Sequence, residues 1–248
     1  MKRRYLQLDV FAARPGAGNP LAVVLDAEGL DDATMQAIAR WTRLPETTFV
    51  FPPTAPGASY RIRMFSPRRE VPFAGHPSVG TAHVVLEAGL AQPRDGLLVQ
   101  EGIAGLLPLR VAGEGARRTI AVRTPKARVM EVATPDWDAV AELAQATESM
   151  GLFVYARSND PVYYYAVRAF VGAPARFEDA ASGAANATLA AWLASRGALP
   201  GGDGHYRVSQ GREVGHDAII DLYVDADGEV GSGGRVCDVV SGHIDWRG

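Results

Sequence analysis

The chain has 248 residues, enough for about one and a half to two domains, and its 47% hydrophobic residues can cover a sizeable core. A formal net charge of −3 and scattered arginines exclude a basic face for nucleic acid or for an anionic membrane, so we expect a small-molecule partner. The single Cys237, an N-terminus that alternates like a strand, and the lack of an apolar stretch of about 18 residues favour a cytoplasmic protein.

The apolar pattern of the first half predicts strands around two helices. The first helix is capped by Asp31 or Asp32, and its apolar residues recur every three or four positions. In chain order we expect strands at 5–11 and 20–25, a helix at 30–44, strands at 47–51 and 60–65, a helix from 75 to about 86, and strands at 96–102 and 105–112.

The second half repeats this order. Its first helix has Thr134 as the cap and Pro135 at the first helical position. We expect a strand at 118–124, a helix at 134–146, strands at 151–156 and 163–171, a helix at 182–197, and strands at 206–211 and 218–225. A constant offset of 108 residues pairs Glu70 with Glu178, Gly75 with Gly183, Ala82 with Ala190, and Gly89 with Gly197.

This repeat predicts an α+β protein of two pseudo-symmetric lobes. The polar, glycine-rich segment 112–118 is the expected boundary, which gives an N-terminal lobe at 1–115 and a C-terminal lobe at 116–248. Whether the last strand packs on the N-terminal lobe is left open. The lobes are expected to face each other across a pseudo-twofold axis.

The two helices rich in small residues are expected to begin at this common cleft. A helix N-terminus presents unpaired N–H groups and a partial positive charge, so two of them would bind a carboxylate-sized anion. The backbone N–H groups of Gly75, His76, Gly183 and Ala184 are the candidate donors, and Pro77 fits the first helical position. The alternative for His76 is a solvated turn histidine that caps a core helix.

Other motif searches predict no metal site and no cofactor. The five histidines show no zinc-ligand spacing. The segment GSGGRV at 231–236 lacks the context of a dinucleotide fingerprint and is interpreted as a hairpin turn.

Five segments together resemble the PhzF-like family of phenazine biosynthesis, which is related in fold to diaminopimelate epimerase. The combination of ETTF with FAGHP is specific, and the likeness runs in order through nearly the whole chain. The segments are GNPLAVVLD at 18–26, LPETTFVFPP at 44–53, YRIRMFSPRREVPFAGHPSVGTA at 60–82, FEDAASGAA at 177–185 and VSQGREVG at 208–215. The resemblance implies that each lobe is a barrel-like mixed sheet around a central helix, that the protein is a homodimer, and that it transfers protons without a cofactor.

The resemblance also implies roles for three ionisable residues. Glu46 matches the family glutamate that moves a proton between substrate carbons as base and then acid, and burial should raise its pKa towards about 6. His76 is expected to hydrogen-bond or protonate the substrate, and Asp179 to hold its polar groups. By position alone, Glu46 reads as a surface carboxylate, and Asp179 as a helix N-terminal carboxylate worth about 0.3 to 1 kcal/mol.

The chain departs from the family pattern in the turn before its second small-residue helix. Ala180, Ser182 and Ala184 stand where the family has proline, threonine and serine. Ser182 keeps the hydroxyl, whereas Ala184 removes a donor worth about 0.5 to 1.5 kcal/mol, which suggests a substrate other than that of the phenazine pathway. The thiols of the related racemases would lie at Ala74 and Ser182, so a two-thiol epimerase is excluded.

Three functions therefore stay open. The first is an isomerase acting on a small carboxylate-bearing metabolite, with Glu46 as the proton carrier. The second is a racemase or epimerase with Glu46 and Asp179 on opposite faces of the substrate. The third is a non-catalytic metabolite-binding protein that kept the fold.

Overall fold

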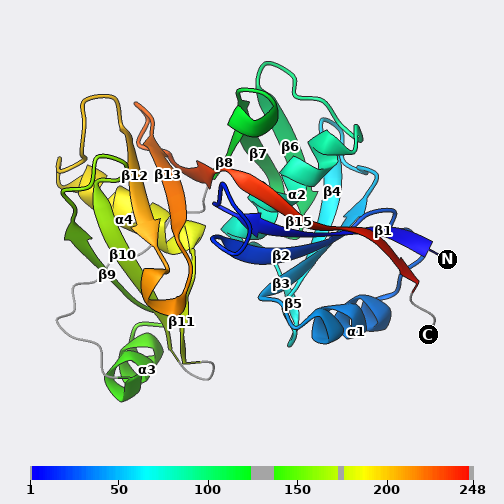
Figure 1. The fold of residues 1–248 in the computed structure, drawn as a ribbon, viewed down its shortest axis with the longest axis horizontal. Helices are drawn as coiled ribbons and strands as arrows, with labels where there is room; N and C mark the ends of the chain where they lie inside the picture. Colours follow the sequence, from blue (N-terminus) through cyan, green and yellow to red (C-terminus); the bar gives the residue numbers. More distant parts are fainter. Residues whose placement is uncertain (1, 124–136, 173–175, 246–248) are drawn as a thin grey trace. The chain divides into compact units, whose positions relative to one another are not determined.

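The structure is a computed structural model that describes residues 2–123, 137–172 and 176–245. The chain divides into two compact units (Figure 1). Unit 1 contains Met1–Arg123 and Gly233–Gly248, and unit 2 contains Thr124–Ser232. The division falls after Arg123 rather than at 115/116, because β8 (Thr119–Arg123) pairs antiparallel with β7 (Gly105–Ala112). The last strand, β15 (Val236–Asp245), pairs with β1 (Lys2–Val10) and so belongs to unit 1.

Unit 1 is a mixed sheet around one helix. Its strands lie in the order β8-β7-β6-β4-β3-β2-β1-β15, and β5 pairs with β4. Two neighbouring pairs, β2 with β3 and β4 with β6, are parallel. The remaining elements of this unit are β2 (Asn19–Val24), α1 (Asp32–Thr42), β3 (Glu46–Phe51), β4 (Tyr60–Phe65), β5 (Glu70–Val71), α2 (Gly75–Glu87), β6 (Leu97–Gly102) and the short 3-10 helix η1 (Gly115–Arg117).

Helix α2 is the central element of unit 1. Eleven of its thirteen residues are buried, and it contacts β1, β2, β3, β6, β8 and β15. A helix that is buried on nearly every side has no polar face, which explains its content of small and apolar residues. Gly80 shows how tight this packing is, since a Cβ there would lie 2.5 Å from Leu21 Cδ2 and 2.7 Å from Val10 Cγ2.

Helix α1 covers the outer face of the same sheet (Figure 1). Asp31 is its cap, with the side chain accepting a hydrogen bond of 2.8 Å from the Thr34 N–H, as one of the two sequence alternatives predicted. Met35 and Ile38 of α1 pack against Phe49 and other buried residues of β2, β3 and β4. Strand β3 is therefore buried on both faces, with alternate residues directed to α1 and to α2.

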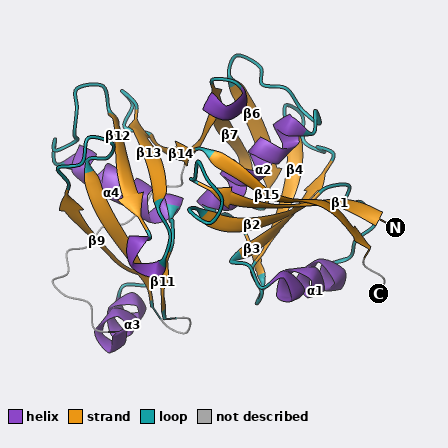
Figure 2. Cartoon of the chain, in the orientation of Figure 1, coloured by secondary structure: helices purple, strands orange, loops and turns teal. Residues whose placement is uncertain are grey.

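Unit 2 has a similar sheet with two helices, α4 on one face and α3 beside β9 and β10 (Figure 2). The strand order is β11-β10-β12-β13-β14, β9 pairs with β10, and the β10–β12 pair is parallel. The elements are α3 (Trp137–Ala146), β9 (Gly151–Arg157), β10 (Tyr165–Val171), β11 (Phe177–Asp179), α4 (Gly183–Ser195), β12 (His205–Gln210), η2 (Arg212–Val214), β13 (Ala218–Val224) and β14 (Val230–Gly234).

The predicted repeat is present in the element bounds. Helices α2 and α4 have 13 residues each, and both of their ends are related by the offset of 108. Both helices end at a left-handed glycine, Gly89 with φ 66° and Gly197 with φ 62°. The N–H groups of these glycines donate to Leu86 and Ala194, which are equivalent carbonyls.

Three local expectations need correction or lie outside the described residues. GSGGRV is not a hairpin turn, because β14 continues into β15 with only Arg235 between them. Gly233 is needed there because a Cβ would overlap the Ile120 carbonyl oxygen. Pro77 is the third residue of α2 rather than the first, which is still a position where no intrahelical N–H bond is lost. The expected cap Thr134 and Pro135 lie outside the described residues.

Two short strands, β5 and β11, were not expected from the sequence. Each pairs with the strand that precedes it, β4 or β10, and each leads directly into the central small-residue helix of its unit. Within the described ranges, no helix combines the length and the apolar character that a membrane crossing requires.

Candidate active site

Glu46 lies at the first position of β3, at the same end of the sheet as the start of α2. Thr48, two residues further along, contacts α2 through a hydroxyl–hydroxyl hydrogen bond of 2.8 Å to Thr81. Because side chains alternate along a strand, Glu46 is directed to this inner face as well. Its side chain is only 19% exposed, so the surface-carboxylate interpretation does not hold.

His76, the second residue of α2, lies beside this carboxyl group. Its Nε2 atom is 3.4 Å from Glu46 Oε2, and the imidazole is 8% exposed. The solvated-turn alternative for His76 is therefore wrong. The two residues come from segments 30 positions apart and meet because β3 packs against α2.

Burial controls the charge of His76. It lowers the pKa of the imidazole from 6.5 to about 3, while a hydrogen bond to the backbone of Pro20 acts weakly in the opposite direction. His76 is thus neutral at physiological pH. A neutral imidazole next to a carboxyl group is an arrangement that can pass a proton.

The second group of expected site residues forms the turn that enters α4. Asp179 ends β11, and its Oδ1 accepts a 3.1 Å hydrogen bond from the Ala181 N–H. Ser182 is the N-cap of α4, and its Oγ accepts from the Ala185 N–H at 3.2 Å. The Ser182 hydroxyl can still donate one hydrogen bond. Gly183 is buried and Ala184 is exposed, and both lie in the first turn of the helix.

A buried glutamine that was not singled out from the sequence supports this turn. Gln210 Nε2 donates to the Asp179 carbonyl at 2.7 Å, and its Oε1 accepts from the Ser182 N–H at 3.1 Å and from Asn186 Nδ2 at 2.8 Å. The adjacent Gly211 has φ 93°, and a Cβ there would overlap the Ala180 carbonyl oxygen. The VSQG segment at 208–211 therefore supports the turn. In the sequence, only the resemblance to the PhzF-like family pointed to this segment.

A repeated ion pair braces the strand before each central helix. Arg63 binds Glu70 through two hydrogen bonds of 2.6 Å, and Arg168 binds Glu178 through bonds of 2.9 and 2.6 Å. The pairing raises the pKa of Arg63 and of Arg168. These bidentate pairs hold β5 against β4 and β11 against β10, so they position the start of each helix.

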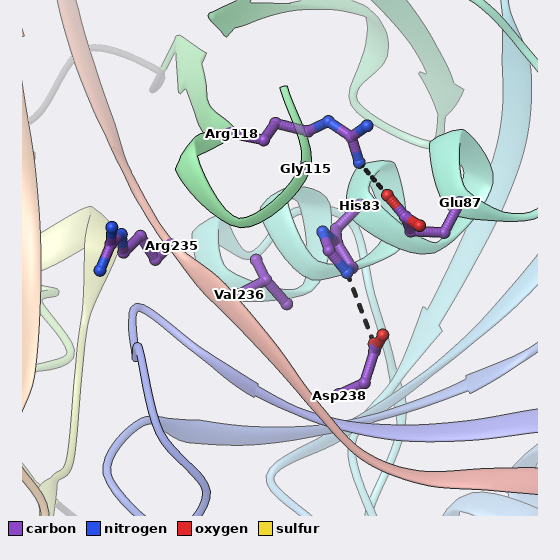
Figure 3. Close-up of a pocket in the computed structure, with 7 residues that line it drawn as sticks. All are labelled: His83, Glu87, Gly115, Arg118, Arg235, Val236 and Asp238. Carbon is purple, nitrogen blue, oxygen red and sulfur yellow. Dashed lines mark hydrogen bonds and ion pairs between the residues drawn. The ribbon is translucent and has the colours of Figure 1, made fainter. Parts of the chain in front are cut away.

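A pocket of about 260 Å³ in unit 1 lies away from Glu46, on the C-terminal half of α2 (Figure 3). His83 Nε2 lies 3.4 Å from Asp238 Oδ1, and Glu87 pairs with Arg118. Figure 3 marks both pairs with dashed lines. Hydrogen bonding to His83 lowers the pKa of Asp238. None of the expected site residues lines this pocket, so we do not assign the proton-transfer site here.

The structure thus brings together three of the expected site residues within unit 1, and four within unit 2. Glu46 and His76 are in contact, and Gly75 precedes His76 at the start of α2. Asp179, Ser182, Gly183 and Ala184 lie together in the turn before α4 and in its first residues. That the two groups serve one substrate stays a prediction.

Comparison with known proteins agrees with these features. The sequence model of the phenazine biosynthesis-like protein family matches residues 8–156 and 131–240. The chain belongs to this family. Relatives that align along nearly its whole length are named isomerases.

One such relative is trans-2,3-dihydro-3-hydroxyanthranilate isomerase from Pseudomonas aeruginosa, 30% identical over 97% of this chain and 95% of its own. An uncharacterized isomerase from Mesorhizobium japonicum is 51% identical over 44% of this chain and 35% of its own length. Antisense-enhancing sequence 1 from Schizosaccharomyces pombe is 42% identical over 51% of this chain. The chain spans only 43% of that last relative, so the match with these two is partial.

Solved structures show the same fold. A PhzF-family protein from Bacillus anthracis has a TM-score of 0.82 at 21% identity, over 99% of this chain and 100% of its own. A predicted epimerase from Pseudomonas aeruginosa has a TM-score of 0.73 at 28% identity, over 98% of this chain and 99% of its own. A hydroxyproline epimerase from Agrobacterium vitis is similar with a TM-score of 0.64 at 13% identity, over 98% of this chain and 92% of its own. The α+β fold of PhzF proteins and related epimerases is thereby confirmed.

Proposed function

We propose that this protein is a cofactor-independent isomerase that moves a proton between two carbons of a small carboxylate-bearing metabolite. Glu46 carries the proton, and His76 positions it. The observation that supports this assignment is the buried contact of 3.4 Å between the Glu46 carboxyl and the His76 imidazole. A carboxyl group held by a neutral base in a largely buried place suits general acid–base transfer.

A single proton carrier favours isomerisation over inversion. When one group both removes the proton and returns it, the proton leaves and arrives on the same face of the substrate, and no stereocentre is inverted. Stereoinversion requires a second base on the opposite face. The paired thiols of the related racemases are replaced here by Ala74 and Ser182, the N-cap residues of α2 and α4. Asp179 would have to act as the second base in a racemase.

Substrate binding is assigned to Asp179, to the Ser182 hydroxyl, and to the N–H groups at the helix starts. These are Gly75 and His76 in unit 1 and Gly183 and Ala184 in unit 2, and the helix dipoles favour a carboxylate near them. Since Ala184 offers no side-chain donor where the family has serine, the substrate is proposed to differ from trans-2,3-dihydro-3-hydroxyanthranilate at the group that this serine would bind.

We also propose that the enzyme works as a homodimer in the cytoplasm. The family resemblance supports the dimer, and the single Cys237 suits a reducing compartment. Sedimentation of the purified chain at the mass of one copy, or recovery of the native protein outside the cytoplasmic fraction, would contradict these two assignments.

Hydrogen exchange in heavy water tests the reaction. The purified protein is incubated with trans-2,3-dihydro-3-hydroxyanthranilate and with related cyclic carboxylates, and deuterium is followed at each carbon by NMR. We expect deuterium at the carbon that gains a proton, with loss of this signal in Glu46→Gln. Glu87→Gln is the matched control, since Glu87 lies at the other end of α2 and pairs with Arg118.

The outcomes separate the candidate functions. Deuterium incorporation with a shifted double bond and retained configuration supports the isomerase. Incorporation with inversion at one carbon, lost in Asp179→Asn as well, supports a two-base racemase. Ligand binding by wild type and Glu46→Gln alike, with neither exchange nor turnover, supports a non-catalytic binding protein.

A further inference from the structure

A pocket of about 430 Å³ in unit 2, the tyrosine pocket, is lined by three segments of the chain. These are the loop 158–164 between β9 and β10, residues 200 and 201 after α4, and residues 205–207 at the start of β12. Sites for small molecules have volumes of about 300 to 1,000 Å³ and are largely formed before the ligand binds. The tyrosine pocket is therefore large enough for a ligand with one aromatic ring.

The tyrosine pocket is separate from the turn that enters α4. Strand β12 begins at the pocket with His205 and ends with Gln210, which supports that turn. At about 3.3 Å per residue, Tyr206 and Gln210 are about 13 Å apart along the strand. The expected site residues, which are all described, do not line the pocket. The proposed proton transfer therefore leaves this pocket without a role.

Hydrogen bonds hold the loop that forms one side of the pocket. The Ser158 N–H donates to the Tyr164 carbonyl at 2.8 Å, and the Tyr164 N–H donates to the Arg207 carbonyl at 2.8 Å. Within the loop, Asp160 Oδ1 accepts from the Val162 N–H at 2.8 Å. The wall of the pocket is therefore ordered by the chain itself and does not need a ligand to form.

Aromatic rings line the tyrosine pocket, among them Tyr164 and His205. The Tyr164 ring contacts the Tyr165 ring at a centroid distance of 5.0 Å. The His205 ring stacks on Tyr223 at a centroid distance of 4.6 Å and an interplanar angle of 13°. Rings that are held by other rings offer flat, rigid surfaces against which a planar ligand can pack.

Arg207 supplies hydrogen-bond donors to the same pocket. Its Nε donates to Asp221 Oδ1 at 3.0 Å, and His205 Nε2 lies 3.1 Å from the same oxygen. This contact fixes the orientation of the guanidinium. Among the described residues, the two Nη groups of Arg207 make no hydrogen bond and no ion pair. Two neighbouring N–H donors on a fixed guanidinium match the two oxygens of a carboxylate.

The hydroxyl group of Tyr206 has no hydrogen-bond partner among the described residues, although it is shielded from solvent. The whole residue is 5% exposed, and burial raises the pKa of the phenol, so that it stays protonated at neutral pH. Buried polar groups in folded proteins nearly always have a partner. A donor without one, on a residue that lines a pocket, points to a ligand that accepts a hydrogen bond there.

We propose that the tyrosine pocket binds a small aromatic carboxylate, whose carboxylate group lies on the Nη groups of Arg207 and whose ring lies against Tyr164. A hydroxyl substituent on that ring would accept the hydrogen bond of Tyr206. Asp160 also lines the pocket, and its negative charge opposes an anion, so we expect a ligand with one carboxylate rather than several. The inference does not depend on the proposed isomerase activity, because the pocket does not include Glu46.

Nuclear magnetic resonance of the full-length, ¹⁵N-labelled protein tests the site with 4-hydroxybenzoate as the probe. We expect saturable shifts of the amide signals of Ser158, Gly201 and Tyr206. Arg207→Gln should raise the dissociation constant at least about tenfold, because it removes a charge-assisted pair, and Tyr206→Phe should raise it about threefold to tenfold. Arg110→Gln is the matched control, since it removes an exposed guanidinium from β7 in unit 1 and should leave the constant unchanged.

Three further titrations test the chemistry of the ligand. 4-Hydroxybenzamide lacks the negative charge, and 4-hydroxycyclohexanecarboxylate lacks the aromatic ring, so each should bind at least about fivefold more weakly than 4-hydroxybenzoate. Asp160→Asn keeps the acceptor for the Val162 N–H and removes the opposing charge. This variant should bind 4-hydroxybenzoate about twofold to fivefold more tightly.

Several results would overturn the inference. These are undiminished binding by Arg207→Gln, equal affinity for the acid and the amide, and no saturation up to about 10 mM. Shifts confined to the amides of Gly75 and Gly183 would do the same, since the probe would then bind only at the helix starts. If circular dichroism shows that Arg207→Gln is unfolded, Tyr206→Phe decides, because it keeps the ring. Glu46→Gln should bind the probe in this pocket as wild type does, so this inference and the isomerase proposal can fail separately.

Discussion

Replacement of Gln210 by alanine tests whether this side chain holds the turn that enters α4. The substitution removes three hydrogen bonds of 2.7, 3.1 and 2.8 Å, made to Asp179, Ser182 and Asn186. Asn186 keeps its bond to the Ser182 carbonyl, so one backbone N–H and one backbone C=O lose their partners. At about 1 to 3 kcal/mol for each buried unsatisfied group, and at the lower end because the turn is partly exposed, we expect a loss of about 2 to 4 kcal/mol.

The assay combines thermal unfolding with amide hydrogen exchange. At about 2 to 4 °C per kcal/mol for a chain of this size, the melting temperature should fall by at least about 4 °C. The Ser182 amide should lose its protection in Gln210→Ala. Gln100→Ala is the matched control, because Gln100 is a buried glutamine of unit 1 that bonds Ser78 of α2.

We expect Gln100→Ala to destabilise the protein while the Ser182 amide stays protected. If the Ser182 amide exchanges equally slowly in wild type and in Gln210→Ala, Gln210 does not support the turn. A melting temperature within about 1 °C of wild type would show that water replaces the lost bonds without cost.

The remaining predictions concern the site and the central helix of unit 1. The pKa of His76 is lower in the folded protein (about 3) than in the unfolded chain (6.5), so the unfolded state binds more protons between these values. The stability due to neutral His76 is thus complete above pH 6.5 and is lost as the pH falls towards 3, by at most about 1.4 kcal/mol per unit. Urea unfolding across this range should be less pH-dependent in His76→Gln, and equal slopes would refute the burial argument. Glu46→Gln should reduce turnover about 10²- to 10⁴-fold with a small change in melting temperature, and retained activity would remove Glu46 from the mechanism. Gly80→Ala should cost about 1 to 3 kcal/mol of unfolding free energy because its Cβ would be 2.5 Å from Leu21 Cδ2. The better helix propensity of alanine by itself would stabilise the protein by about 1 kcal/mol, so a stabilised Gly80→Ala would contradict the overpacking.

The elements with a strong local pattern could be predicted from the sequence. The strands at 60–65 and 105–112 were predicted with the observed bounds, and the cap of α1 was one of two adjacent aspartates. The repeat could be found because glycine stands where both central helices close with a positive φ. These signals are local, since caps, turns and periodicity depend on residues within a few positions of each other.

The short strands and the last strand could not be predicted in the same way. Strand β5 has two residues, too few for any periodicity, and it exists because β4 and the Arg63–Glu70 pair hold it in place. GSGGRV has the composition of a turn, but it forms an extended strand in which close packing against Ile120 requires a glycine at position 233. In both cases a distant partner overrides the local preference.

The same distinction applies to the site. The sequence by itself determined the fold class and the family, and it marked Glu46, His76 and Asp179 as candidate site residues, because these depend on which residues stand in which order. Only the tertiary structure decided that the side chains of Glu46 and His76 lie 3.4 Å apart and that Gln210 supports the turn of Asp179. These contacts join segments far apart in the chain, and the protonation of a buried group depends on what surrounds it in space.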